Sequence, residues 1–196
     1  MGHFITTKQT ITNEIKEVID RLTIDFDSLN HLWNESSQNS NWTAKEIAEH
    51  IYLVNQYVIS KVKYTKGLIL EGFVNNEMDY KESDLNVVDI MLSVSLYRVK
   101  APAEFTKSLC FSAEEMKLKL IYQINVLTSL LKELPEEMIN NYKEHSKFVS
   151  GIKLDLYQLI YLSVIHCKHH LSQISTLKEI EHVLSQEELV SVYYQS

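Results

Sequence analysis

The sequence predicts an all-α fold: a four-helix bundle with a long crossover between its second and third helices. The 196 residues, which suit one domain spanning 1–196, include only 4 Gly and 2 Pro, too few turn residues for a β-sandwich or barrel. Apolar residues recur at three- and four-residue steps along four long stretches, as on one face of a helix. About forty residues (71–111) separate the second stretch from the third, enough chain to cross the length of a bundle.

The first two stretches predict helices over about 7–36 and from about Thr43 to Leu70. The apolar stripe of the first stretch is broken by a polar run over 36–41. Thr43 and Glu46 match the T-x-x-E capping box that opens many helices. Since only about seven residues separate the two helices, we expect them to be antiparallel neighbours.

The second half of the chain predicts a long connection and two more long helices. Within residues 71–111 the pattern indicates a shorter helix over 84–99. The third long helix is expected over 112–134, opened by a second capping box, and the fourth over about 155–184. A polar stretch over 136–151 separates these two helices. The crossover would allow the second and third long helices to run parallel.

Charge and cysteine usage exclude several classes of protein. The formal net charge is −7 and no basic stripe is present, so we expect no nucleic-acid partner. No apolar run reaches the ~18 residues of a membrane span, so we expect no membrane partner. Cys110 and Cys167 lie far apart and form no C-x-x-C motif, which favours reduced thiols in a reducing compartment.

The chemistry-bearing feature is a group of histidines near the C-terminal end. His166 and His170 stand one helical turn apart, ~40° from each other around the axis, and two imidazoles at that spacing can bind one ion. Both continue the core-facing stripe, where burial of a polar ring is costly unless it finds a partner such as a metal. His169, ~100° away from His170, should face outward or sideways. The same spacing also arises by chance on helix surfaces, so the inward placement carries the prediction.

The third ligand should come from a facing helix, and His50 is the best candidate. It lies at the edge of the second stripe, at mid-bundle height. Three histidines with an open coordination position are the arrangement of catalytic rather than structural zinc sites. Gln173, one turn beyond His170, could hold a ligand imidazole or a water, and Glu46 could join or orient His50. Cys167 is either a small buried hydrophobe or a fourth, soft ligand.

Three segments resemble the DinB/YfiT-like family. Residues 42–51, WTAKEIAEHI, are similar to its helix-two signature, in which a His follows a Trp by eight positions. Residues 166–174, HCKHHLSQI, resemble its helix-four pattern H-x-x-x-H-x-x-Q-I, and Lys-Ala-Pro at 100–102 resembles its connector after helix two. The chain departs from many members at Cys167, where they carry Asp.

The resemblance implies a bacterial cytoplasmic four-helix bundle, often a homodimer, with one divalent metal on His50, His166 and His170. Three imidazoles suit zinc, nickel, copper or iron, of which we favour zinc and nickel. Characterised relatives are transferases and isomerases that use low-molecular-weight thiols such as bacillithiol or mycothiol, and others are called hydrolases. We therefore expect a metal-dependent enzyme that activates a thiol or water towards a small-molecule substrate. The alternative is a non-catalytic metal- or ligand-binding stress-response module on the same fold.

Overall fold

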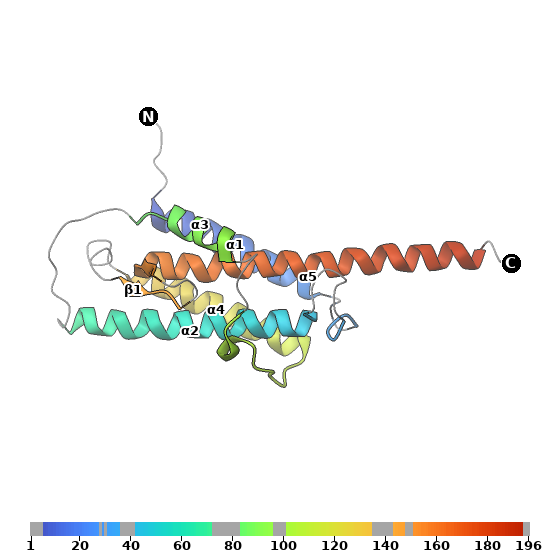
Figure 1. The fold of residues 1–196 in the computed structure, drawn as a ribbon, viewed down its shortest axis with the longest axis horizontal. Coiled ribbons are helices and arrows are strands. Elements are labelled where there is room, and N and C mark those ends of the chain that lie inside the picture. Colours follow the sequence, from blue (N-terminus) through green and yellow to red (C-terminus); the bar gives the residue numbers. More distant parts are fainter. Residues whose placement is uncertain are drawn as a thin grey trace, which may run out of the picture.

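Four long helices form the bundle that the sequence predicts (Figure 1). The structure is a computed structural model, and it describes residues 6–27, 29, 31–35, 42–71, 83–95, 101–134, 143–147 and 151–193. The long helices are α1 (Thr7–Phe26), α2 (Ala44–Leu70), α4 (Ala113–Glu133) and α5 (Leu156–Tyr193). The all-α four-helix fold class is thereby confirmed.

Smaller elements occupy the two long connections. The crossover carries α3 (Asn86–Ser95), which packs on α5, and the short 3-10 helix η1 (Ala103–Phe105), which packs on α2. Between α4 and α5, strand β1 (Glu144–His145) pairs antiparallel with β2 (Lys153–Leu154), where only a polar stretch was expected. Gly151 precedes β2 with a φ of 83°, a left-handed conformation that favours glycine.

The first two helices are not the neighbours that the short connection suggested. α1 packs against α4 and α5, and α2 packs against the same two helices, so α1 and α2 lie diagonally across the bundle. The prediction of adjacent helices was therefore wrong, although the two do run in opposite directions (Figure 1). α2 and α4 run parallel, as the long crossover allows: Gln123 donates to the Tyr52 carbonyl at 3.1 Å, and Lys66 pairs with Glu133 further along both helices.

The first helix also ends ten residues earlier than expected. α1 stops at Phe26, and the apolar residues beyond it belong to a buried turn that closes one end of the bundle. Leu29 and Leu32 are buried there, and the Trp33 indole donates to the Phe111 carbonyl at 3.3 Å. The turn therefore connects α1 to the diagonal helix while continuing the core.

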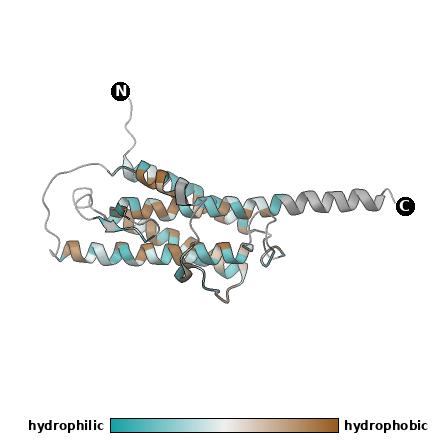
Figure 2. Ribbon diagram, viewed as in Figure 1, coloured by the Kyte–Doolittle hydropathy of each residue, from teal (hydrophilic) through white to brown (hydrophobic). Residues whose placement is uncertain are grey.

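Capping and burial explain the remaining bounds. Both predicted capping boxes are present, at Thr43–Glu46 and at Ser112–Glu115. Hydrophobic and hydrophilic residues alternate along the described helices (Figure 2), and the hydrophobic ones fill one core shared by all four.

α3 is shorter than the expected 84–99, and 96–99 lie outside the described residues. The backbone of α5 continues past the expected end at 184 and extends beyond the other long helices (Figure 1). Within the described residues, no helix has the length and apolarity needed to cross a membrane.

Candidate metal centre

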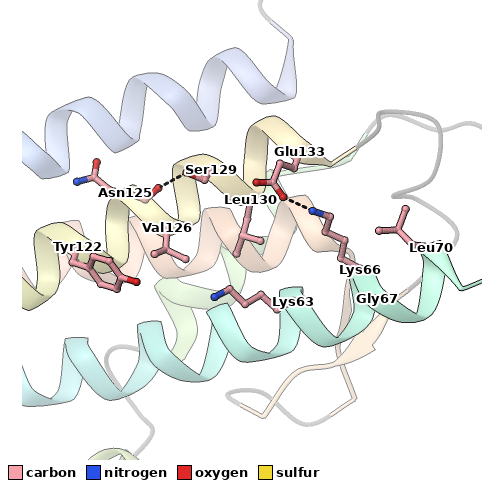
Figure 3. Close-up of a pocket in the computed structure, with 10 residues that line it drawn as sticks. All are labelled: Lys63, Lys66, Gly67, Leu70, Tyr122, Asn125, Val126, Ser129, Leu130 and Glu133. Carbon is pink, nitrogen blue, oxygen red and sulfur yellow. Dashed lines mark hydrogen bonds and ion pairs between the residues drawn. The ribbon is translucent and has the colours of Figure 1, made fainter.

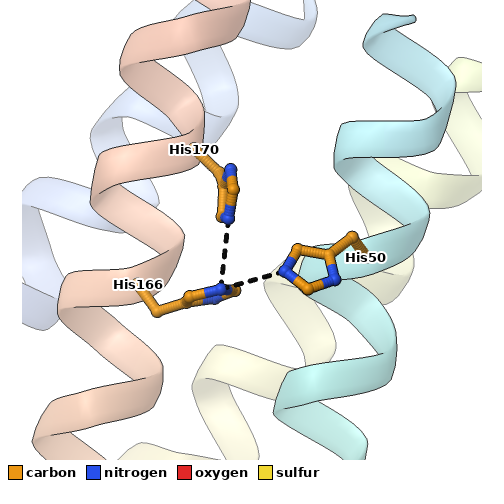
Figure 4. Close-up of side chains that lie close together, drawn as sticks. All are labelled: His50, His166 and His170. Carbon is orange, nitrogen blue, oxygen red and sulfur yellow. Dashed lines mark hydrogen bonds between the residues drawn. The ribbon is translucent and has the colours of Figure 1, made fainter. Parts of the chain in front are cut away.

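The structure brings together the three histidines singled out in the sequence (Figure 4). His50 projects from α2 towards His166 and His170 on α5, and all three side chains are buried. The Nε2 atom of His166 lies 3.1 Å from the Nε2 atom of His50 and 3.1 Å from that of His170. Nitrogen atoms that share one ion at ~2.0–2.1 Å stand ~3.0–3.4 Å apart, so this spacing fits a common ligand ion.

The positions of the three rings follow from residue spacing along α5 and from the packing of α2 against α5. His166 and His170 are separated by four residues, so they stack on one face of α5. His50 meets them because α2 and α5 pack side by side and antiparallel. A second contact between the same helices, in which the buried Ser163 hydroxyl donates to the Asn55 side-chain oxygen at 2.6 Å, fixes that register.

The outer nitrogens of two histidines are held by oxygen acceptors. The Nδ1–H group of His50 donates to the Phe105 carbonyl at 2.9 Å, and the Nδ1–H group of His170 donates to Gln173 Oε1 at 2.8 Å. Because a carbonyl oxygen can only accept, both neutral rings carry their proton at Nδ1 and direct an unprotonated Nε2 into the cluster. In His170, which the sequence predicted as a partner of Gln173, Nε2 is therefore the nitrogen that is free to bind an ion.

The donor set fits a divalent cation better than it fits hydrogen bonding among the histidines. His166 Nε2 faces two nitrogen lone pairs, and a single Nε2–H group could be donated to only one of them. The alternative tautomer leaves three lone pairs facing one another, which is unfavourable without a cation between them. His166 Nδ1 is buried and has no hydrogen-bond partner among the described residues. One ion bound to all three Nε2 atoms removes the conflict between their lone pairs and places the His166 proton on Nδ1.

Neighbouring groups support the site in ways that the sequence did not foresee. The Trp42 ring lies parallel to that of His170 at 6.5 Å and edge-on to that of His50 at 5.1 Å, so it forms an aromatic wall. Buried Glu49 accepts from the Leu109 backbone N–H at 2.8 Å and ties α2 to the chain after η1, the 3-10 helix that ends at Phe105. Burial raises the pKa of the Glu49 carboxyl.

Three other sequence candidates take different places. The Glu46 carboxylate is exposed and caps α2 through Thr43, so the expectation that it joins or orients His50 was wrong. Cys167 is fully buried, and among the described residues its thiol is not part of the metal-competent cluster. Burial raises its pKa to about 12, which keeps it a neutral thiol. His169 faces sideways: it is half-buried and its ring lies 5.4 Å from that of His170.

Burial keeps the three central imidazoles neutral. It lowers the pKa of His50, and it lowers the pKa of His170 to about 3. Burial, together with the neighbouring histidines, holds the pKa of His166 well below its usual range. A free imidazole near pH 6.5 would lose a bound metal to protons as the pH falls below that value. In this site, the competition is displaced to lower pH.

The metal-free protein is expected to lose stability as the pH falls below about 6.5. In the unfolded chain these histidines bind protons near 6.5, whereas in the folded chain they resist protonation, His170 down to about 3. The unfolded state therefore holds more protons in this window, which lowers the free energy of unfolding by up to about 1.4 kcal/mol per pH unit for each such histidine. Urea unfolding with chelator at pH 7, 6 and 5 measures this slope. His170→Leu should flatten it relative to His145→Leu, at an exposed histidine, and a flat profile in the parent protein would contradict the pKa assignment.

A separate groove lies between α2 and α4 (Figure 3). Its volume is about 590 Å³, and it is lined by Lys63, Gly67, Tyr122 and Val126 among others, with Lys66 paired to Glu133 across it. Lys63 is thirteen residues along α2 from His50, ~20 Å at the rise of a helix. The groove shares no lining residue with the histidine cluster.

Comparison with known proteins identifies the family and agrees with the fold. The family model described as the DinB superfamily matches residues 14–174, which include the three histidines and Gln173. A structure of a protein from Streptococcus pneumoniae shares 16% identity at a TM-score of 0.57, over 92% of this chain and 94% of that one. An uncharacterized protein from Clostridium difficile 630 shares 15% identity at a TM-score of 0.56, over 91% and 99%. At these identities the likeness shows the fold alone. No curated protein matches the sequence.

Proposed function

This chain belongs to the DinB superfamily, as its motifs predicted, and we propose that it is a divalent-metal-dependent enzyme acting on a small-molecule substrate. We further propose that His50, His166 and His170 are its metal ligands. The observation that carries the proposal is the convergence of three buried Nε2 atoms, two of them on rings whose outer proton is held by an oxygen acceptor.

The donor set favours an anionic co-ligand. Three neutral imidazoles contribute no charge, and no carboxylate joins them in the described part of the chain. A dication held there would stabilise an anion beside it, lowering the pKa of a coordinating thiol or water towards neutrality. Zinc and nickel are the ions we favour, because both accept nitrogen donors and leave room for a further ligand.

The residues around the three histidines have separate roles in such a site. The Phe105 carbonyl and the Gln173 amide hold two rings in the tautomer that points Nε2 inward. Trp42 packs against two of the rings, and we propose that it shields that side of the site from water and offers an apolar surface to the carbon skeleton of a substrate. We propose a transferase reaction in which a low-molecular-weight thiol gives up its proton to solvent and its sulfur attacks an electrophilic carbon. The new C–S bond forms as the bond from that carbon to its leaving group breaks, and the leaving group departs with the electron pair. Hydrolysis, with water in place of the thiol, is the variant of the same site.

A thiol-consumption assay tests the function. Protein loaded with zinc or nickel is mixed with bacillithiol, glutathione or cysteine and a panel of electrophiles, and loss of free thiol is followed. We expect turnover that requires metal, disappears in His166→Ala and persists in the control His145→Ala, at an exposed histidine. Ester substrates without thiol test the hydrolase variant. Stoichiometric metal without turnover in either assay would support a non-catalytic metal-binding module instead.

A further inference from the structure

The side-chain amide of Gln173 lies between two histidines of the same helix. Its oxygen accepts from His170 Nδ1 at 2.8 Å, and its nitrogen donates to His169 Nε2 at a longer distance of 3.4 Å. The residues are three and four positions before Gln173, so one turn of α5 aligns all three. The His169 ring also packs edge-on against His170, with centroids 5.4 Å apart and planes at 72°.

The orientation of this amide determines which nitrogen of His170 is protonated. With the oxygen towards Nδ1, the ring keeps its proton there and Nε2 is free to bind an ion. With the amide reversed, an N–H group would face Nδ1 and favour the other tautomer, whose Nε2–H points into the cluster and cannot bind metal. The two ends of an amide have nearly the same shape, so packing alone selects poorly between them.

We propose that His169 is a positioning residue: by accepting from the Gln173 amide nitrogen, it turns the amide oxygen to His170 and fixes the metal-binding tautomer. The inference rests on the proposed metal site and adds to it a residue that touches no ligand ion. His169 is half-buried beside Gln173, and its Nε2 accepts this hydrogen bond when the ring proton is on Nδ1. Partners of ligand histidines typically change metal affinity 10–100-fold when removed.

Two substitutions at His169 separate its hydrogen bond from its ring. His169→Phe keeps an aromatic ring against His170 but removes the acceptor, whereas His169→Gln removes the ring and keeps an acceptor oxygen. Zinc affinity is measured by competition with a chromophoric chelator. We expect His169→Phe to weaken binding by ~3–10-fold, less than the ~10–100-fold expected for Gln173→Leu, and His169→Gln to stay within ~2-fold of the parent protein.

Adding His169→Phe to Gln173→Leu tests whether His169 acts through the amide. We expect no further loss in the double variant, because the group that His169 positions is already gone. Parent-like affinity in His169→Phe, an equal loss in His169→Gln, or additive losses in the double variant would each overturn the inference.

A second readout does not depend on metal. The ¹⁵N chemical shifts of the His170 ring in the metal-free protein report its tautomer. We expect the Nδ1–H form in the parent and in His169→Gln, and a mixture of forms in His169→Phe. If the parent bound no zinc, the proposed function would fail, and this spectrum would still decide the positioning role: an unchanged tautomer in His169→Phe would refute it.

Discussion

Replacing His166 by alanine is expected to abolish stoichiometric binding of a divalent metal. His166 Nε2 lies 3.1 Å from each of the other two ligand nitrogens, and its loss leaves two donors on different helices. We expect affinity for zinc to fall by more than the ~100-fold that marks the upper range for outer partners of a ligand. The measurement is metal content after dialysis, with chelator competition for the residual affinity.

The control for this substitution is His145→Ala. His145 is exposed in β1 and lies outside the histidine cluster, so the same chemical change there should leave metal binding intact. Circular dichroism should show both variants as helical as the parent protein. Parent-like zinc affinity in His166→Ala would mean that the ion binds elsewhere.

Leu120→Ala is expected to destabilise the fold by about 2–5 kcal/mol. Leu120 lies in α4 with 0% of its surface exposed, within the core shared by the four long helices. Alanine there removes buried methyl groups and leaves a cavity that the surrounding helices can only partly fill. Denaturant unfolding at neutral pH measures the change in the free energy of unfolding.

The same helix supplies a matched control two residues away. Leu118 is 59% exposed, so Leu118→Ala makes the same chemical change at a similar helical position without opening a cavity. We expect the free energy of unfolding to change by no more than about 0.5 kcal/mol. Comparable losses from Leu118→Ala and Leu120→Ala would contradict the assigned orientation of α4.

The sequence predicts those parts of the fold that depend on local sequence patterns. Apolar periodicity located four long helices, and two capping boxes located the starts of α2 and α4 within a residue. Periodicity could not show that α1 ends at Phe26, because Leu29, Leu32 and Trp33 continue the same spacing in a buried turn. Periodicity also does not identify which helices are neighbours, because an apolar stripe indicates that one face of a helix is buried but not which helix packs against it.

The sequence likewise predicts some residues of the candidate site and not others. Helical spacing and the family resemblance pointed to His50, His166, His170 and Gln173, and the structure brings them together. The Phe105 carbonyl could not be foreseen, because every residue carries a backbone oxygen and only the path of the crossover places this one at His50. Trp42 had a signal in the family motif, but its contact with both rings depends on tertiary packing.

Anomalous diffraction from zinc-loaded crystals would show directly whether the three histidines bind a metal ion. We expect one strong anomalous peak for each protein chain, ~2.0–2.1 Å from the Nε2 atoms of His50, His166 and His170. The peak should be absent from crystals of His166→Ala grown with the same zinc concentration. A peak bound elsewhere, or no peak at the three histidines of the parent protein under saturating zinc, would contradict the claim that these residues form a metal centre.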